Sequence, residues 1–365
     1  METKTMGTPV GPRMVINGRE VDYYCGTSYY TLHGDQRLID AACEAVRRYG
    51  LGPATVMNAP PYQEVVERAG AFFETETAVY VISGYLADMV LLQALSDNYD
   101  LVFVDERSHY SVFDGLHATG KRLVPFRHLD ANDLAHKLRG EVKPGQTPLV
   151  MSDGIFPSTG AIAPLKDYVE VLAAYNDALT CIDDSHAVGV IGEKGQGTYE
   201  YLDLQGSNRY LAGTLAKAFG GVGGIVPGSH ELKEKIKQHS RVPIGASPAS
   251  VAAAAAAAMG LRILSEHPEM RKQLWCNVAR VRGGLRKLGL NVGTSPVPIV
   301  SLQSTSGLDV KRLLQELDKR GIVVAHVAAR GYSDAPEVES LRIAVFSTHT
   351  KAQIDRLLEA IGKLL

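Results

Sequence analysis

The chain has 365 residues, of which 45% are hydrophobic and 21% charged, values typical of a globular protein with a large buried core. This composition excludes a disordered chain, a collagen-like chain and a membrane protein. With 38 Lys and Arg against 40 Asp and Glu, the formal net charge is −2, which gives no reason to expect nucleic acid or an anionic membrane as a partner. A small molecule and a second copy of the chain are the expected partners.

The spacing of the cysteines and the length of the apolar runs indicate in which cellular compartment the protein acts. Cys25, Cys43, Cys181 and Cys276 have no CxxC spacing, and the first residues lack the apolar stretch of a signal peptide. The longest apolar run, Val251–Met259, is mostly alanine and is far shorter than the roughly 20 residues that span a bilayer. We therefore predict reduced thiols, a cytoplasmic protein and a packed helix at this run.

Secondary structure is predicted from the spacing of apolar residues. Residues 1–18, with several Gly and Pro, are expected to form an arm or loop, and helical spacing follows at Leu38–Tyr49 and Tyr62–Phe73. Strand-like runs and helical patterns then alternate. They are Ala78–Ile82, Leu86–Ser96, Leu101–Val104, Arg122–Pro125, Ala131–Leu138, Pro148–Met151, Leu165–Tyr175 and Leu179–Ile182. This alternation predicts an α/β fold with a parallel sheet covered by helices on both faces.

The pattern changes after Arg241. Long helices are predicted at Pro248–Glu266, expected to link two domains, and at Met270–Leu288. Shorter strand-like and helical patterns follow at Val297–Leu302, Asp309–Arg320, Ile322–Val324, Leu341–Val345 and Lys351–Ile361. We divide the chain into an N-terminal arm (1–45), a large domain (46–245), and a linking helix with a smaller C-terminal α+β domain (246–365).

Lys217 lies in the segment AGTLAKAFGGVGG, in which it is the only charged residue. Burial among small and apolar residues lowers the pKa of a lysine and makes it a better nucleophile. Lysines of this type form Schiff bases. A flexible glycine loop with an incidental lysine accounts for the segment equally well when it is taken alone.

A second polar segment begins where an apolar strand ends, in LTCIDDSHAVGVIG. Ligands of open α/β sheets bind at the carboxyl ends of strands, so Asp183 and His186 are expected at the mouth of a site. A strand-terminating turn is the alternative. A metal site at Asp183, Asp184 and His186 is disfavoured, because no other cluster of His, Asp and Glu has ligand spacing.

Two further strand ends carry polar residues. The segment VDERSHYSVFDG contains His109, and ISGYLAD places Ser83 and Gly84 at the start of a helix, whose free N–H groups suit a phosphate. With Lys217 and Asp183, these residues provide what pyridoxal 5′-phosphate (PLP) requires. The lysine forms the Schiff base, the acid pairs with the pyridinium nitrogen, the helix start holds the phosphate, and the histidine stacks on the ring.

Several motifs in the same order resemble those of fold-type I PLP enzymes and, within them, the α-oxoamine synthases. This group includes 8-amino-7-oxononanoate synthase and 2-amino-3-ketobutyrate CoA ligase. The resemblance runs from about Tyr23 to the C-terminus through SGYLAD, DERSHYSVFDG, GAIAPL, IDDSHAVGVIG, GTLAKAFGGVGG and SLRIAVFSTHT. It implies a large domain with a mostly parallel, seven-stranded sheet between helices, a smaller α+β domain, and a homodimer with shared active sites.

The resemblance also implies a role for each matching residue. Its catalytic residues are Lys217 for the Schiff base, Asp183 for the pyridinium nitrogen, His186 for the phenolic oxygen and His109 on the ring face. Its further cofactor-binding residues are Ser83, Gly84 and Tyr85 near the phosphate, the Thr214 hydroxyl, and Ser247. Arg342 matches the arginine that takes the substrate carboxylate, a role that suits a bidentate guanidinium.

The chain departs from the family pattern in its substrate-binding segments. Ser28 stands where the family has an asparagine that helps to hold the amino acid, and LGPATVM (51–57) replaces a glycine-rich stretch ending in Ser-Arg. Gln63 replaces a histidine, Pro157 a serine, and a hydroxyl pair that reaches the partner subunit's phosphate is reduced to Ser247. Cofactor chemistry is thus retained while substrate recognition has changed.

The leading hypothesis for function is decarboxylative condensation of a small amino acid with an acyl-CoA thioester, through a Lys217 aldimine and a quinonoid. An aminotransferase, or an amino-acid racemase or epimerase, that uses the same Lys217 and Asp183 is the alternative, because it needs fewer substrate contacts. A third hypothesis is a catalytically silent subunit, which the retained Lys217 disfavours.

Overall fold

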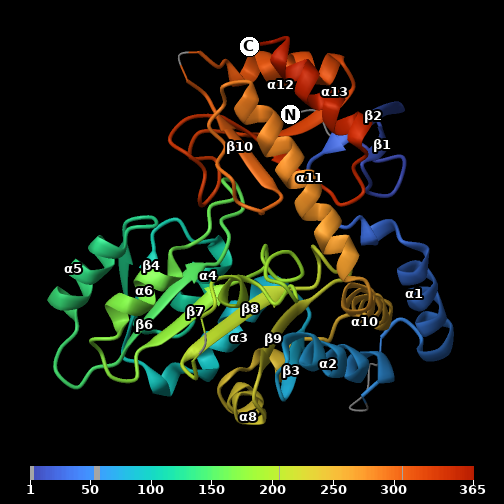
Figure 1. Cartoon of the computed structure of the whole chain (residues 1–365). Helices are drawn as coiled ribbons and strands as arrows, with labels where there is room; N and C mark the ends of the chain where they lie inside the picture. Colours follow the sequence, from blue (N-terminus) through green and yellow to red (C-terminus); the bar gives the residue numbers. More distant parts are fainter. Residues whose placement is uncertain (1–3, 53–57, 205, 306) are drawn as a thin grey trace.

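Two β-sheets organise the chain, one in a large domain and one in a small domain above it (Figure 1). The computed structural model describes residues 4–52, 58–204, 206–305 and 307–365. In these ranges the large sheet has seven strands, in the spatial order β3 (Thr77–Val81), β9 (Gly224–Gly228), β8 (Arg209–Thr214), β7 (Leu179–Asp183), β6 (Pro148–Asp153), β4 (Leu101–Asp105) and β5 (Arg122–Phe126). Only β9 runs antiparallel to its neighbours, which confirms the predicted, mostly parallel sheet.

Helices cover both faces of this sheet, as predicted. They are α1 (Gln36–Tyr49), α2 (Pro60–Phe73), α3 (Gly84–Ala94), α4 (Tyr110–His117), α5 (Ala131–Glu141), α6 (Leu165–Leu172), α7 (Thr198–Tyr201), α8 (His230–His239), α9 (Val242–Gly245) and α10 (Val251–Glu266), with 3₁₀ turns at Leu32–Gly34 and Ser96–Asn98. Alternate residues of β4 bury on opposite faces: Val102 and Val104 pack with α3 and α4, whereas Leu101 and Phe103 pack with α5 and α6. Burial of both faces explains why the strand sequences are continuously apolar.

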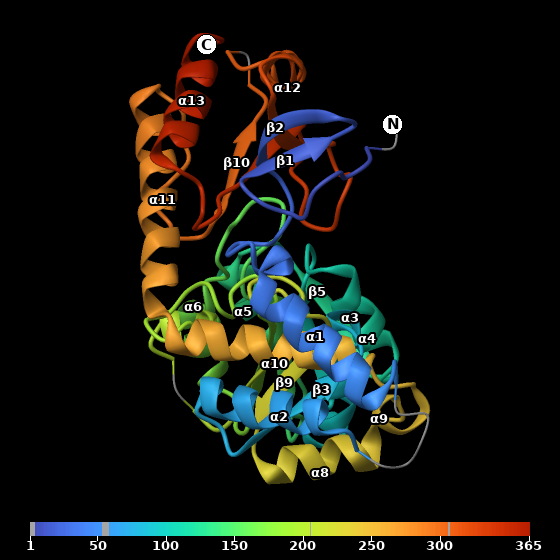
Figure 2. The ribbon, with the colours of Figure 1, turned by 90° about the vertical axis from the view of Figure 1, so that its right-hand side faces the viewer.

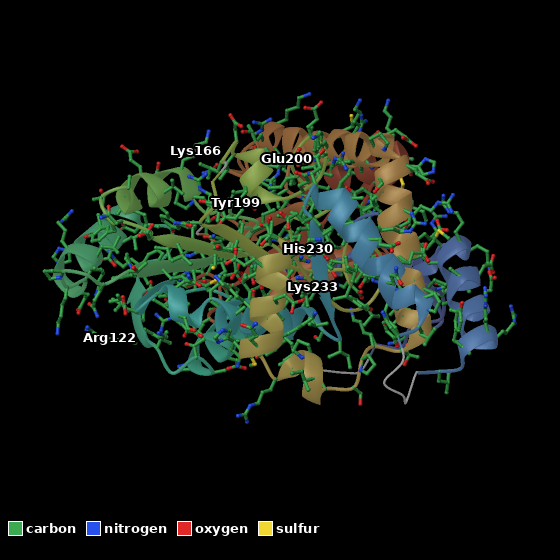
Figure 3. All side chains as sticks on the ribbon, turned by 90° about the horizontal axis from the view of Figure 1, so that it is seen from below. Arg122, Lys166, Tyr199, Glu200, His230 and Lys233 are labelled. Atoms are coloured by element: carbon green, nitrogen blue, oxygen red, sulfur yellow. The ribbon has the colours of Figure 1, made fainter. Side chains whose placement is uncertain are left out.

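The sequence pattern does not predict β8 and β9, because glycine, proline and arginine interrupt their apolar runs. Both strands nevertheless lie within the sheet, and β8 leads directly into the segment that carries Lys217. On the side of the sheet away from the small domain, α8 buries Leu232 and Ile236 and carries His230 and Lys233 near its start (Figure 3). No helix in the described ranges has the length and apolar character needed to cross a membrane.

The small domain has a five-stranded sheet and three helices among the described residues. Its strands, in spatial order, are β1 (Arg13–Ile16), β2 (Arg19–Tyr24), β11 (Ile322–Val327), β12 (Ser340–Ala344) and β10 (Ile299–Gln303), and its helices are α11 (Pro268–Lys287), α12 (Val310–Lys319) and α13 (Lys351–Gly362). The expectation that residues 1–18 form only an arm or loop is wrong for β1. Asn17 and Gly18, both at positive φ, make a tight turn between β1 and β2, and β2 pairs in parallel with β11.

The two long helices take different roles. The alanine-rich α10 is largely buried against α1 and α2 in the large domain, as expected for a packed helix. Its close approach to the Lys217 segment depends on glycine, because a Cβ at Gly260 would lie 1.8 Å from the Phe219 carbonyl oxygen. The link between the domains, expected at 248–266, is made instead by α11, which rises from the large domain into the small one (Figure 2).

Candidate active site

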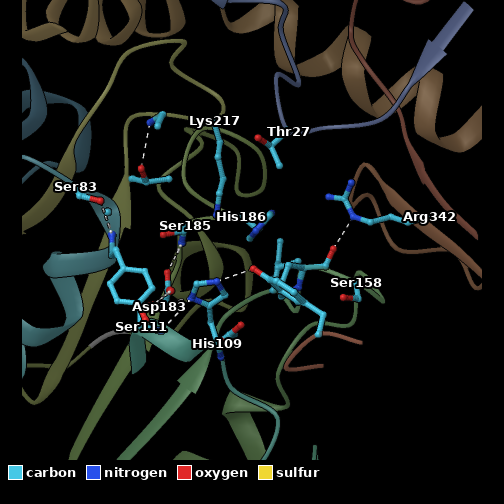
Figure 4. A pocket seen from close by; sticks show the side chains of 18 of the residues that line it. Thr27, Ser83, His109, Ser111, Ser158, Asp183, Ser185, His186, Lys217 and Arg342 are labelled. Atoms are coloured by element: carbon cyan, nitrogen blue, oxygen red, sulfur yellow. Dashed lines mark hydrogen bonds between the residues drawn. The ribbon is translucent and has the colours of Figure 1, made fainter. Parts of the chain in front are cut away.

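A cavity of about 630 Å³ opens where the carboxyl ends of β6 and β7 meet the small domain. Nine residues singled out from the sequence line it: Ser83, Gly84, Tyr85, His109, Asp183, His186, Thr214, Lys217 and Arg342. Figure 4 shows Lys217 pointing into this space, between Asp183 and His186, with Arg342 reaching in from the small domain. The fold therefore gathers residues that are up to 259 positions apart, from Ser83 to Arg342, into one site.

One end of the cavity is the start of α3. Ser83 caps this helix by accepting a hydrogen bond from the Tyr85 N–H (3.2 Å). A Cβ at Gly84 would lie 2.6 Å from Thr214 Cβ, so only glycine lets the helix start this close to the end of β8. Thr214 Oγ1 donates to the Gly223 carbonyl (3.0 Å) and accepts from the Ala216 N–H (3.2 Å). A helix N-terminus beside fixed hydroxyl groups suits a phosphate.

Lys217 lies opposite the start of α3, in the loop that follows β8. Burial lowers the pKa of Lys217 to about 8, and the nearby carboxylate of Asp183 opposes this shift without cancelling it. At neutral pH the uncharged fraction of this amine is therefore much larger than that of an ordinary lysine, and the uncharged amine is the state that attacks an aldehyde.

Asp183, Asp88 and Asp153 are buried carboxyl groups near the end of β7. Asp183 Oδ1 accepts from the Ser185 N–H (2.9 Å), and its Oδ2 lies 3.5 Å from Ser111 Oγ. Burial raises the pKa of Asp88 and of Asp153 well above the usual range, and the charge of Asp183 adds to both shifts. Asp183 and Asp153 line the cavity, whereas Asp88 lies behind them, bonded to the Ser111 hydroxyl (2.9 Å).

His109 caps α4 and is held on three sides. Its backbone N–H donates to Asp153 Oδ1 (2.9 Å), its Nδ1 lies 3.2 Å from the Ser111 N–H nitrogen, and its Nε2 lies 2.7 Å from the Tyr332 hydroxyl. Burial lowers the pKa of His109. A neutral imidazole fixed in this way presents a flat face to the cavity.

His186 is buried beside Lys217 and is hydrogen-bonded to the fully buried Tyr29, whose hydroxyl lies 2.8 Å from His186 Nδ1. Burial lowers the pKa of His186 well below its ordinary value, and the positive charges of Lys217 and Arg342 add to this shift. The imidazole is therefore neutral and holds one polar nitrogen for a ligand.

Arg342 extends from β12 to the cavity rim. Its Nε donates to the Pro157 carbonyl (2.6 Å) and its Nη1 to the Gly26 carbonyl (3.0 Å). A guanidinium has five N–H donors, so these two bonds orient the group and leave three for a ligand. Pro157, where the family has serine, contributes its carbonyl to this arrangement, a role that proline can fill.

Two predicted residues lie outside the cavity lining. Ser28 is buried behind it and donates to His33 Nδ1 (2.6 Å), while His33 Nε2 donates to the carbonyl of Ala216, which precedes Lys217. Ser247 lines a second, separate hollow of about 620 Å³ beside α2 and α9. Their assigned roles remain predictions.

Two further departures from the family pattern lie away from the cavity lining or outside the described residues. Gln63 bonds to Glu67 on the surface of α2, and the changed segment 53–57 lies outside the described residues.

Sequence reasoning missed several residues that the fold brings to the site. Thr27, Ser111, Asp153 and Tyr332 line the cavity. Ser111 and Asp153 each lie at a strand end or just after one, and this position was a signal that could have found them. Nothing local marks Tyr332, which comes from a loop of the small domain.

Comparison with known proteins agrees with this geometry. The family model described as aminotransferase class I and II matches residues 27–361. The chain belongs to this family. It is 32% identical to 8-amino-7-oxononanoate synthase of Thermosipho melanesiensis over 366 residues, covering 99% of this chain and 92% of the relative. It is 31% identical to 8-amino-7-oxononanoate synthase 1 of Bacillus subtilis, with the same coverage.

Solved structures of this family share the fold. A serine palmitoyltransferase of S. paucimobilis with a bound PLP–myriocin aldimine superposes with a TM-score of 0.90 at 26% identity, covering 99% of this chain and 92% of that one. The Sphingomonas wittichii serine palmitoyltransferase gives 0.87 at 26% identity, covering 99% and 91%. The chain is thus a fold-type I, PLP-dependent transferase of the acyltransferase type. The glycine-dependent cradle at α3 and the facing pair of Lys217 and Asp183 fit this cofactor.

Proposed function

We propose that this enzyme condenses a small amino acid with an acyl-CoA thioester and releases CoA and carbon dioxide. The observation that carries the proposal is the arrangement of one cavity, in which Lys217 and Asp183 lie between a phosphate-type helix start and the Arg342 guanidinium. The similarity to 8-amino-7-oxononanoate synthases and serine palmitoyltransferases supports the acyl-transfer branch.

Each residue has a distinct task in this proposal. PLP, when bound, supplies an electron sink for the charge that develops at the substrate Cα. The α3 N-terminus, with Ser83 and Thr214, holds the phosphate, and the Asp183 carboxylate keeps the ring nitrogen protonated. Lys217 Nζ, whose pKa is about 8, would hold the cofactor and, once the amino group of the substrate has taken its place there, would accept the proton from the substrate Cα.

The remaining groups orient the ring and the substrate. The His109 imidazole packs against the ring face, and His186 donates to the phenolic oxygen of the ring. Arg342 binds the substrate carboxylate with the N–H groups that do not contact Pro157 and Gly26. A guanidinium held by two backbone carbonyls is oriented before the substrate arrives, which reduces the entropy lost on binding.

A homodimer with shared sites is part of the proposal. Ile244 is 75% exposed, and it lies with Tyr62 and Ser247 on the second hollow beside α2 and α9. Ile82, which is also exposed, and Val242 line the same hollow, so Ile244 belongs to a continuous apolar surface of the kind that a partner covers. This surface supports the assignment of Ser247 to the partner subunit's cofactor site. We also propose that the enzyme acts in the cytoplasm.

The test is product analysis with the purified holoenzyme. A panel of small amino acids, each labelled at the carboxyl carbon, is combined with acyl-CoA thioesters of increasing chain length. We expect one amino acid to give free CoA thiol and labelled carbon dioxide in equal amounts. Release of a 2-oxo acid without CoA would instead indicate an aminotransferase. Loss of optical activity without carbon dioxide would indicate a racemase.

Replacement of Arg342 with alanine is expected to weaken amino-acid binding while cofactor affinity is maintained. Loss of hydrogen bonds to a charged group costs about 1.5–3 kcal/mol, which is roughly a 10- to 150-fold rise in the dissociation constant. Spectral titration with the preferred amino acid measures this dissociation constant. The matched control is Arg280→Ala, which removes an exposed pair with Asp355 and is expected to have little effect. Unchanged affinity in the Arg342 variant would place the carboxylate elsewhere.

A further inference from the structure

Tyr332 connects the small domain to the cofactor site of the large domain. It lies in the loop between β11 and β12, and its hydroxyl is 2.7 Å from Nε2 of His109, a residue 223 positions earlier in the chain. Both residues line the cavity. Figure 4 shows His109 among the side chains that line this cavity.

The other contacts of His109 determine which way this bond runs. The Ser111 backbone N–H can only donate and lies 3.2 Å from His109 Nδ1, while the Ser111 hydroxyl, 2.8 Å from the same nitrogen, can donate or accept. An unprotonated Nδ1 satisfies both groups when Nε2–H has an acceptor of its own, and the Tyr332 hydroxyl supplies that acceptor. Burial lowers the pKa of His109, which favours a neutral ring. The single ring proton is then on Nε2, and Nε2–H donates to the Tyr332 hydroxyl oxygen.

An aromatic contact and hydrogen bonds of the same loop fix the position of Tyr332. Its ring packs edge to face on Tyr110, with centroids 5.4 Å apart and an angle of 76° between the planes. Two residues later, the fully buried Asp334 accepts the backbone N–H groups of Ser158 (2.7 Å) and Thr159 (3.2 Å) in the large domain. The loop that carries Tyr332 is therefore anchored to the large domain beside the site.

We propose that Tyr332 is a positioning residue, which fixes the tautomer and the ring orientation of His109 and so prepares the face on which the cofactor stacks. This inference rests on the proposed function in one respect, namely that His109 stacks on the ring of the cofactor. The cofactor site then depends on how the small domain packs against the large domain, because the acceptor for His109 Nε2–H comes from the small domain.

The first test measures the tautomer in the cofactor-free protein. Long-range ¹H–¹⁵N spectra of protein with ¹⁵N-labelled histidine distinguish Nε2–H from Nδ1–H, and the signal lost in His109→Gln assigns the residue. We expect a single Nε2–H form in the wild type, a mixture in Tyr332→Phe, and no change in Tyr110→Phe. The Tyr110 variant is the matched control, because it removes a hydroxyl from the same aromatic cluster but leaves the bond to His109.

The second test measures the consequence for the cofactor. PLP affinity of the cofactor-free protein is expected to fall about three- to tenfold in Tyr332→Phe, the effect of one hydrogen bond, with kcat reduced and the KM for the acyl donor unchanged. Tyr332→Leu provides the same measurement should the phenylalanine variant fold poorly. An unchanged His109 tautomer, or an altered tautomer with unchanged PLP affinity, would overturn the proposal. A wild-type protein that shows the Nε2–H form but does not attach PLP at Lys217 would contradict the proposed function instead.

Discussion

Lys217→Ala is expected to abolish covalent attachment of PLP and to lower turnover by at least about 10²- to 10⁴-fold, the range that a positioned general base contributes. Lys217 is the only lysine among the described residues that line the cavity, so no other amine can take its place. The variant is expected to lose the visible absorbance of the lysine-bound cofactor. Borohydride treatment of the wild type should fix the cofactor mass to the peptide that contains Lys217.

The control for this variant is Lys363→Ala, which removes an exposed lysine that pairs with Glu359 of α13 and lines neither the cavity nor the hollow that contains Ser247. It should leave both absorbance and turnover unchanged. Because the pKa of Lys217 is about 8, the fraction of uncharged amine increases as pH rises through 8. The rate of cofactor attachment to the wild type should therefore increase with pH up to this point and then level off. Borohydride-stable cofactor in Lys217→Ala would show that another residue binds it.

Asp183→Asn is expected to reduce turnover by roughly 10²- to 10⁴-fold, since loss of one partner of a buried charge pair costs about 3–5 kcal/mol. The amide has the same shape as the carboxylate but no charge, so the ring nitrogen of the cofactor loses the anion that keeps it protonated. Asp88 and Asp153 are poor replacements, because burial raises the pKa of both carboxyl groups well above the usual range and so disfavours their charged forms. Steady-state kinetics with the preferred substrates measures the loss.

The adjacent Asp184 separates this effect from general damage to the strand end. Asp184 is fully buried, but its carboxylate accepts from the N–H (2.7 Å) and the hydroxyl (2.5 Å) of Thr198 and does not line the cavity. Asp184→Asn is therefore expected to lower the thermal midpoint and to leave kcat within a few-fold. Equal losses of kcat in both variants would show that Asp183 acts through the fold and not through the cofactor.

The retained and the altered residues are neighbours in the site. The groups expected at the cofactor, namely Lys217, Asp183, His109 and His186, lie together on the large domain. The departures at Ser28 and Pro157 lie next to the Arg342 and Lys217 segments, where the amino acid is expected to bind. We expect the chain to keep the family chemistry and to differ in its substrate, a prediction that the product analysis tests directly.

The sequence by itself determined most of the strand and helix order between residues 36 and 183 of the large domain. Strands buried on both faces must be continuously apolar, and the helices between them show a 3.6-residue period, so both signals are local. The same local patterns predicted that Ser83, His109 and Asp183 follow the carboxyl ends of strands, where a parallel sheet binds ligands. Lys217 was identified from its apolar neighbours, although β8, the strand before it, was not.

Only the tertiary structure decided the contacts between distant segments. The pairing of β2 with β11 drew the N-terminal residues into the small domain, and α11 rather than α10 joined the domains. The bond from Tyr332 to His109 and those from Arg342 to Pro157 and Gly26 join residues 185 to 316 positions apart. No periodicity or motif encodes such pairs, because they depend on how two independently patterned domains pack against each other.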